Sequence, residues 1–213
     1  MKRPNQIAYE FIKGRILDGT YRPAERLVEA QLAEEIGVSR NTVKKVLLQI
    51  EQERLLVIED NKGARVHSLS IEEIQEYYEI RKALEVLVVQ SAVDLITAEQ
   101  IAQMEDILIT MEQLKAEENY DAYSEHNKLF HEIIYESSDK TIAVEMIRGI
   151  KTQLTRFQFR TMIAPGRADS SIIEHRLLLD GFKRRDKDAV TEAIVSHISN
   201  VSGTIARFKA LFS

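Results

Sequence analysis

The sequence predicts a mainly α-helical protein with two domains. A winged helix-turn-helix, made of three helices and a β-hairpin wing, is expected over residues 1–69, and an all-α antiparallel helical bundle over 70–213. Helices are favoured because the 213 residues include only three prolines and eight glycines, the residues that most often interrupt them. The first segment carries 12 basic and 10 acidic residues and the second carries 17 and 24, so the two domains are expected to bind different partners.

Composition excludes several classes of protein. Hydrophobic residues make up 44% and charged residues 30% of the chain, as in globular proteins rather than disordered ones. The chain has no cysteine, which excludes disulfides and thiolate metal sites and fits a reducing compartment. No apolar run approaches the roughly 20 residues of a membrane span, and the N-terminus lacks an apolar signal core. We therefore expect a cytoplasmic protein without a membrane partner.

Apolar residues at helical spacing predict the first two helices. The first is expected over about 7–17, with Ile7, Phe11 and Ile16 close to one face. The second is expected over about 28–36, where leucine and isoleucine recur among glutamates. The apolar faces of these two helices then need a third element to cover them.

That third element is a helix with a defined start. Gly37 suits the left-handed position that follows the second helix, and Ser39 is placed to cap a third helix that continues to about Glu53. Its apolar stripe consists of Val43, Val46, Leu47 and Ile50. The face left for solvent or a partner carries Asn41, Lys44, Lys45 and Gln49.

Two short β-prone segments follow this helix. Residues 55–58 and 64–67 are separated by Glu, Asp, Asn, Lys and Gly, a combination that indicates a hairpin. The order helix, helix, turn, helix, hairpin is that of a winged helix-turn-helix.

From residue 70 onward the pattern is helical throughout. Ser70 to Glu73 and Thr97 to Gln100 fit capping boxes. Helices are expected over about 71–96, 98–116, 120–137, 140–163, 171–184 and 187–211, with an irregular break at 164–170. This is the expected bundle.

The third helix has the features of one that reads DNA. Such a helix presents polar and cationic side chains from its first turn while its other face is buried. Ser39 and Thr42 can bond phosphates and Arg40 can bond phosphate or guanine, a bidentate guanine contact contributing about 1–3 kcal/mol of discrimination. A capped amphipathic helix with lysines is also common on protein surfaces, so the spacing of the helices and the wing favour the DNA-binding interpretation.

Ordered landmarks over residues 7–69 resemble the N-terminal domain of GntR-type transcriptional regulators. The landmarks are Pro23 to Glu29, Leu32-Ala33, Gly37 to Arg40, Val43, Leu47, Glu51, Leu55 and the wing Asn61 to Val66. The resemblance implies double-stranded operator DNA as a partner. By position it implies DNA contacts from Arg26, Ser39, Arg40, Asn41, Thr42, Lys44 and the wing tip Asn61, Lys62 and Gly63.

This sequence departs from the usual family pattern in the recognition helix. Asn41-Thr42 replaces Thr-Pro, and Lys44-Lys45 replaces Arg-Glu. Lys44 keeps the positive charge but loses the planar fork of arginine, which binds phosphate or guanine bidentately. The resemblance therefore implies DNA binding without implying an operator sequence.

Histidines in the second segment form a candidate metal site. Asn127 and His131 are four residues apart on one helical face, and His175 and His197 lie on two other predicted helices. Three imidazoles and an oxygen donor can converge in a bundle core, which is how bundles build metal sites. The alternative is that each is an isolated core or surface histidine.

The second segment resembles the FCD ligand-binding domain of the FadR subfamily. The matching stretches are Tyr78-x-x-Arg81-x-x-Leu84-Glu85, Asn127-x-x-Phe130-His131, Glu174-His175-x-x-Leu178-Leu179-x-Gly181 and Ala193-x-x-x-His197. The resemblance implies a divalent metal bound by Asn127, His131, His175 and His197. Asn127 stands where the family has Asp, so the donor set is neutral, and three imidazoles favour zinc or nickel.

A small organic acid is the expected effector, because a dication with open positions attracts a carboxylate. The residues expected to bind the other end of the acid are Arg81, Arg148 and Arg156, with Tyr78 and Glu85 as further candidates. The alternative for each arginine is a surface ion pair.

Three functions remain open at this point. The leading hypothesis is a homodimeric, effector-controlled transcriptional repressor, whose two recognition helices lie about one DNA turn apart. A metal-dependent hydrolase is an alternative, since three histidines with an open position resemble a catalytic zinc site. It lacks an identifiable general base, because Glu125 and Glu174 are adjacent to histidines only in sequence. A constitutive DNA-binding protein with a purely structural metal is the third.

Overall fold

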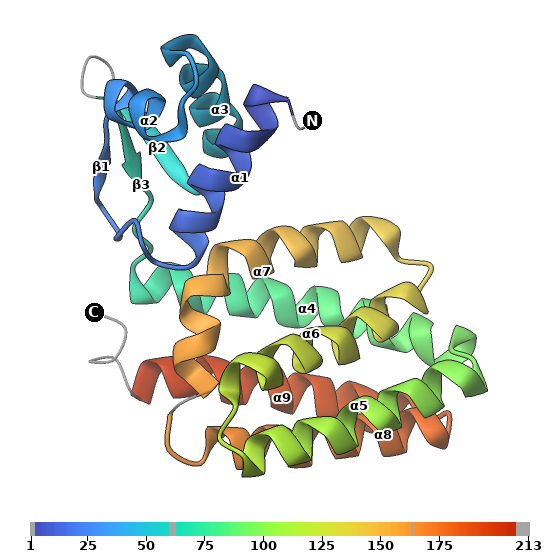
Figure 1. The fold of residues 1–213 in the computed structure, drawn as a ribbon. Helices are drawn as coiled ribbons and strands as arrows, with labels where there is room; N and C mark the ends of the chain where they lie inside the picture. Colours follow the sequence, from blue (N-terminus) through green and yellow to red (C-terminus); the bar gives the residue numbers. More distant parts are fainter. Residues whose placement is uncertain (1–2, 60–62, 163, 208–213) are drawn as a thin grey trace. The chain divides into compact units, whose positions relative to one another are not determined.

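The computed structural model describes residues 3–59, 63–162 and 164–207, and the chain divides into two compact units, Met1–Ser70 and Ile71–Ser213 (Figure 1). Both are mainly helical, and the first also holds a small sheet. The predicted fold class is confirmed. The unit boundary lies one residue from the boundary expected from the sequence.

The first unit contains three helices and a three-stranded antiparallel sheet. Its elements in chain order are α1 (Pro4–Leu17), β1 (Arg26–Leu27), α2 (Glu29–Ile36), α3 (Arg40–Gln52), β2 (Leu56–Glu59) and β3 (Gly63–Val66). The strand order is β1-β3-β2. The hairpin was predicted, but β1 was not, because this two-residue strand exists only through its pairing with β3.

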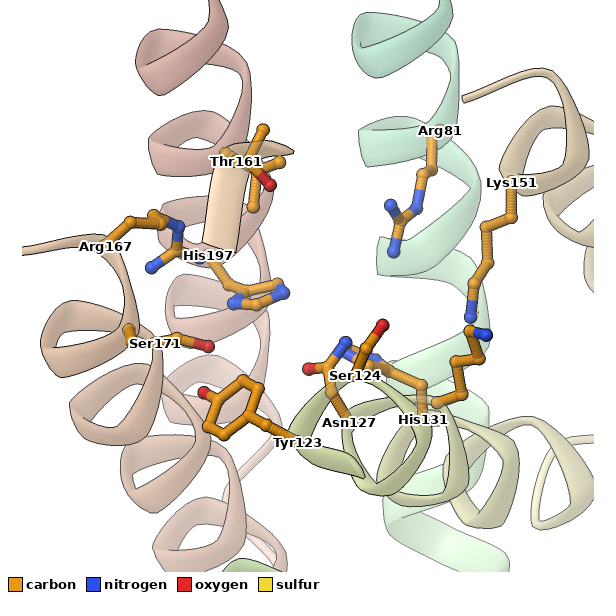
Figure 2. A pocket seen from close by; sticks show the side chains of 13 residues that line it. Arg81, Tyr123, Ser124, Asn127, His131, Lys151, Thr161, Arg167, Ser171 and His197 are labelled. Carbon is orange, nitrogen blue, oxygen red and sulfur yellow. The ribbon is translucent and has the colours of Figure 1, made fainter. Parts of the chain in front are cut away.

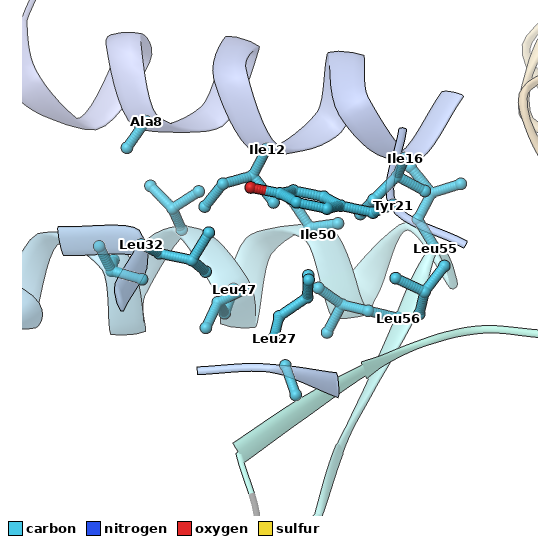
Figure 3. Close-up of a cluster of buried hydrophobic side chains, with 14 of the residues drawn as sticks. Ala8, Ile12, Ile16, Tyr21, Leu27, Leu32, Leu47, Ile50, Leu55 and Leu56 are labelled. Atoms are coloured by element: carbon cyan, nitrogen blue, oxygen red, sulfur yellow. The ribbon is translucent and has the colours of Figure 1, made fainter. Parts of the chain in front are cut away.

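An entirely apolar core holds these elements together (Figure 3). The stripe predicted for α3 is buried as expected, at Val43, Val46, Leu47 and Ile50. Of the face predicted for α1, Ile16 is buried and Phe11 packs partly buried against the core, but Ile7 is 41% exposed and was wrongly included. The buried residues of α1 are Ala8, Ile12 and Ile16.

The turn between α2 and α3 follows the predicted chemistry. Gly37 has φ of 74° and its N–H donates to the carbonyl of Ala33 at 3.0 Å, which ends α2 in the left-handed conformation. Ser39 is the N-cap of α3 and accepts a hydrogen bond from the Thr42 N–H at 3.1 Å. Glycine and serine therefore fix the angle at which α3 leaves α2.

The second unit is a bundle whose described residues form six helices. They are α4 (Ile71–Leu95), α5 (Ala98–Ala116), α6 (Tyr120–Glu136), α7 (Thr141–Met162), α8 (Arg167–Lys183) and α9 (Lys187–Arg207). Helix α9 packs against both α4 and α8, and α5 packs against α6 and α8. None of the described helices is long and apolar enough to cross a bilayer.

Close packing between α8 and α9 depends on Gly181. A Cβ atom added to this residue would lie 2.6 Å from Cγ2 of Val190 and 3.2 Å from its backbone nitrogen. Only glycine therefore allows the first turn of α9 to approach α8 this closely. This contact therefore determines how closely α8, which carries His175, packs against α9, which carries His197.

Candidate functional site

The first turn of α3 presents the polar surface predicted to read DNA. Arg40, Asn41 and Lys44 are exposed, while the apolar stripe on the other side of the helix is buried in the domain core. The Ser39 hydroxyl lies 2.9 Å from that of Thr42, so the two hydroxyls order this turn. The arrangement is that of a recognition helix with its N-terminal end free for base edges and phosphates.

Two arginines lie next to each other on the sheet of the wing. Arg26 on β1 is directly opposite Arg65 on β3, and both are exposed. Like charges in this position destabilise a sheet unless an anion compensates them. Glu59 compensates Arg65 at 3.1 Å, and no such ion pair involves Arg26 among the described residues, which leaves Arg26 available to phosphate.

The wing turn is only partly described. Gly63 has φ of 86°, and a Cβ atom there would lie 3.0 Å from the carbonyl oxygen of Leu27, so this position needs glycine. The predicted contacts Asn61 and Lys62 lie outside the described residues. Gly63 is thus a structural requirement of the turn that carries them.

Three buried histidines converge in the core of the bundle. His131 comes from α6, His175 from α8 and His197 from α9. One ring nitrogen from each lies within 4.8 Å of the others, and the ring centroids are 4.9–5.3 Å apart. The structure therefore brings together the three imidazoles that the sequence predicted as metal ligands.

Hydrogen bonds fix the tautomers of two of these rings. Nδ1 of His175 donates to the carbonyl of Ser171 at 2.6 Å, and Nδ1 of His197 donates to Oε2 of Glu174 at 2.7 Å. Each ring then carries its lone pair on Nε2, and neither the His175 Nε2 nor either nitrogen of His131 has a hydrogen-bond partner among the described residues. Metal-binding histidines are held in this way.

Burial keeps the three rings neutral. It lowers the pKa of His175 to about 3 and also lowers the pKa of His131 and of His197. The neighbouring imidazoles lower the pKa of His131 and His175 further. A neutral imidazole is the form that binds metals, so burial leaves the three rings in the form that a metal would require.

The residues fit a divalent metal ion. One ring nitrogen of each histidine lies within 4.8 Å of the others, and those of His131 and His175 have no hydrogen-bond partner among the described residues, which is a reason to expect a ligand there. Asn127 lies one helical turn before His131 and lines the same cavity, where its amide offers a neutral oxygen. The chemistry of such a donor set favours zinc or nickel over magnesium or calcium.

Cationic side chains surround this cavity (Figure 2). Arg81 from α4, Lys151 from α7 and Arg167 at the start of α8 all line it, together with His131 and His197. Figure 2 shows these groups entering from different helices toward one space. An anion bound here would meet positive charge from several sides.

The cations that line the cavity, which also include Lys128 of α6, differ in their partners. Lys128 pairs with Glu125 at 2.6 Å. Arg81 donates to Glu85 at 2.9 Å and Arg167 to Glu174 at 2.8 Å. Lys151 has no ion pair with a carboxylate among the described residues, and its ammonium lies 5.0 Å from the ring centroid of Tyr135. Burial and the charge of Arg81 lower the pKa of Lys151 to about 8.

The predicted effector residues are only partly brought to the cavity. Arg81 lines it. Tyr78 and Glu85 are fully buried but are not among the lining residues. Arg148 is placed elsewhere, in an exposed ion pair with Glu132 at 2.6 Å, because it faces outward from α7. The side chain of Arg156 lies outside the described residues.

Sequence reasoning missed several residues that helical spacing could have found. Tyr123 lies four residues before Asn127, and Arg167 and Ser171 lie eight and four residues before His175. All three line the cavity. Lys151 carried no comparable signal, because its helix approaches the cavity only through tertiary packing.

Neither of the two glutamates that precede histidines in the sequence is placed as the base that a hydrolase would need. Glu174 accepts hydrogen bonds from Arg167, His197 and Asn200, and these interactions hold its pKa below the usual value although burial raises it. Glu125 is 67% exposed and pairs with Lys128. Neither carboxylate is placed to activate water at the three histidines.

Two family models match the chain. The model for bacterial regulatory proteins of the gntR family matches residues 4–66, and the FCD domain model matches residues 76–200.

Three curated relatives span nearly the whole chain. The uncharacterized HTH-type transcriptional regulator YdhC of Bacillus subtilis (strain 168) is 28% identical over 195 residues, with 90% of this chain and 86% of that protein covered. The transcriptional repressor RspR of Escherichia coli (strain K12) is 22% identical, with 96% and 90% covered. The gluconate operon transcriptional repressor of Bacillus licheniformis is 25% identical, with 91% and 82% covered. These relatives are transcriptional regulators, not enzymes.

Solved structures share the fold. McbR/YncC of E. coli has a TM-score of 0.78 at 23% identity, with 98% of this chain and all of that chain covered. The Listeria monocytogenes regulator Lar has a TM-score of 0.70 at 15% identity, with 98% and 99% covered. Both likenesses extend over the two units.

Proposed function

The chain belongs to the GntR family of bacterial transcriptional regulators and carries an FCD domain, and on that premise we propose that it is a repressor released from its operator by a small organic acid. The acid is proposed to bind in the bundle, together with a divalent metal. We also infer membership of the FadR subfamily, because the FCD domain implies it. Repression is supported by the relatives that are named as repressors.

The observation that carries this proposal is the cluster of His131, His175 and His197. One ring nitrogen of each lies within 4.8 Å of the others, and His131 and His197 line a cavity whose wall also contains Arg81, Lys151 and Arg167. A metal ion bound there would act as a Lewis acid that binds a carboxylate. The cationic wall then stabilises the anion and gives the acid a preferred orientation.

Control of DNA binding requires two arrangements of the protein. We propose a homodimer in which the two recognition helices read half-sites about one DNA turn apart. The acid releases DNA only if it binds more tightly to an arrangement with a different half-site spacing. The described side chains that we propose to contact the operator are exposed. They are Arg40, Asn41 and Lys44 on α3 and Arg26 on β1.

The direct test first selects the operator from a pool of random DNA duplexes with the full-length protein. Binding of the protein to the selected DNA is then measured by fluorescence anisotropy. Gluconate, acetate, lactate and succinate are added with zinc or with a chelator. Gluconate is included because a relative is named for the gluconate operon. We expect at least one acid to weaken operator binding, and only when metal is present.

Two outcomes distinguish the proposal from the remaining alternative. If removal of metal lowers the melting temperature while no acid changes operator affinity, the metal is structural and the protein is a constitutive DNA binder. Loss of sensitivity to the acid in His175→Gln, with operator affinity retained, supports the proposed control.

The DNA surface is tested with matched variants of α3. Arg40→Ala is expected to weaken operator binding by about 1–3 kcal/mol and to relax discrimination at one base position. Gln49→Ala is the control, since Gln49 is exposed on the same helix two turns further on. Equal loss in the two variants contradicts the assignment of the first turn as the reading end.

A further inference from the structure

Lys151 on α7 is an amine that lines the bundle cavity without an anionic partner. It lies in the cavity wall together with Arg81 and Lys128, but no ion pair joins it to a carboxylate among the described residues. Its nitrogen lies 5.0 Å from the ring centroid of Tyr135, an aromatic contact that stabilises a cation less than a carboxylate does. Figure 2 shows the Lys151 side chain reaching toward the cavity from α7.

The surroundings of this amine favour its neutral form. Burial is the largest cause, and the positive charges of Arg81 and Lys128 act in the same direction, whereas Glu85 and Glu132 oppose them. The balance lowers the pKa of Lys151 to about 8, so at pH 7 about one amine in ten has a free lone pair. A desolvated lysine beside other cations is how proteins activate this side chain as a nucleophile toward carbonyl compounds.

Lys128 provides a comparison within the same cavity wall. Its side chain is 43% exposed and donates to Glu125 at 2.6 Å. The nitrogen of Lys128 is therefore solvated and held as an ammonium ion by a carboxylate. Of these two lysines, Lys151 is the one suited to attack an electrophilic carbon.

We propose that the amine of Lys151 forms a reversible imine with the carbonyl carbon of a small 2-oxo acid bound in this cavity. The lone pair of the amine forms the C–N bond, the carbonyl oxygen leaves as water with the two protons of the amine, and a C=N bond remains. The step involves no oxidation or reduction and no third reactant. This inference rests on the proposed function, because it names the chemical class of the acid.

The charges beside Lys151 select an acid whose carbonyl is next to its carboxylate. Arg81 on α4 is the charged residue that acts most strongly on the Lys151 amine, and α4 packs against α7. A carboxylate paired with Arg81 leaves the adjacent carbonyl carbon beside the amine. A simple ketone lacks the anion that pairs with Arg81, and a 2-hydroxy acid lacks the electrophilic carbon.

The test is reductive trapping on the full-length, metal-free protein. Pyruvate is added with sodium cyanoborohydride, which reduces an imine to a stable secondary amine, and mass spectrometry of peptides locates the modified lysine. We expect Lys151 to be labelled about 10-fold faster or more than any other lysine, because each unit by which the pKa falls raises the neutral fraction about 10-fold. Lactate, which carries a hydroxyl in place of the carbonyl, is expected to give no label. Equal labelling of all lysines, or faster labelling of Lys128, overturns the proposal.

Lys151→Arg removes the nucleophile and keeps the positive charge. In the unchanged protein, pyruvate is expected to release the operator at about a tenth of the lactate concentration, which corresponds to about 1.4 kcal/mol. The two acids are expected to be equally effective in Lys151→Arg. Lys128→Arg is the matched control and is expected to keep both the preference for pyruvate and the label on Lys151. A preference for pyruvate that survives in Lys151→Arg contradicts the proposal.

The measurements separate this inference from the proposed function. If acids release the operator but no label forms on Lys151, the imine fails and control by the acid stands. If Lys151 is labelled while no acid changes operator affinity, the proposed control fails and the imine stands. Melting curves check that each variant is folded, and the labelling of the unchanged protein depends on no variant.

Discussion

The two domains bury different kinds of side chains. The core of the DNA-binding domain consists of apolar residues alone, whereas every fully buried polar or charged residue in the described part of the chain lies in the bundle. Buried charges cost stability unless they are paired and hydrogen-bonded. Several of these buried groups, among them Arg81, His131, Arg167 and His197, line one cavity of the bundle, and this contrast between the domains supports that cavity as the proposed ligand site.

The contrast also separates two ways of positioning functional groups. In the first domain, an apolar core and the cap at Ser39 hold α3 rigidly, and the functional side chains need only be exposed. In the bundle, the functional groups are themselves buried, so each needs a partner that fixes it. Glu174 has that role for Arg167 and His197.

The largest expected effect comes from removing that partner. Glu174→Ala leaves Arg167 buried without a counterion and His197 without its acceptor, and we expect a loss of about 3–5 kcal/mol in the free energy of unfolding. Urea unfolding followed by circular dichroism measures it. The double variant Arg167→Met with Glu174→Met is the control and is expected to lose less, since no lone charge remains. A single variant as stable as the unchanged protein contradicts the contrast between the domains.

A slightly smaller effect is expected from the apolar core. Leu47→Ala removes a side chain that is 1% exposed, and we expect about 2–5 kcal/mol of destabilisation together with loss of operator binding. Its neighbour Leu48 is 46% exposed, so Leu48→Ala is expected to change stability by less than about 0.5 kcal/mol. Similar losses in the two variants would show that the buried stripe is wrongly assigned.

The smallest effect is a dependence of bundle stability on pH. The pKa of His175 in the folded protein is about 3, below the unfolded value of 6.5. Between these values the unfolded state binds the proton, so the contribution of His175 is complete above pH 6.5 and is lost as the pH falls toward 3.

The free energy of unfolding of the metal-free protein is therefore expected to fall as the pH is lowered from 6 to 4. In His175→Gln this fall is expected to be about 1.4 kcal/mol per pH unit smaller than in the unchanged chain. Chemical unfolding at several pH values measures the slope. His126→Gln, outside the cluster, is the control. Parallel pH profiles for the unchanged chain and His175→Gln would mean that the ring is already protonated in the folded protein.

Sequence patterns predicted the elements well where local chemistry sets their ends. Helix α5 has the expected bounds 98–116, because the capping box at Thr97 and Gln100 satisfies its first amides. Helix α8 begins four residues before its expected start, because Gly166 begins it without a side-chain cap. On α1, Ile16 is buried as predicted, but Ile7 was placed on the buried face in place of Ala8, because a small residue such as Ala8 gives a weak signal.

The sequence by itself determined the fold class, the division into two units and the buried stripe of α3, because these follow from periodicity and caps. The resemblance singled out the three histidines, and only the tertiary structure shows that they meet. Tertiary structure alone decided which charges face the cavity. It brought Lys151 and Arg167 to the histidines and left Arg148 in an exposed ion pair. The physical reason is that helical periodicity states which face of a helix a residue occupies, whereas packing between helices distant in the chain decides what that face meets.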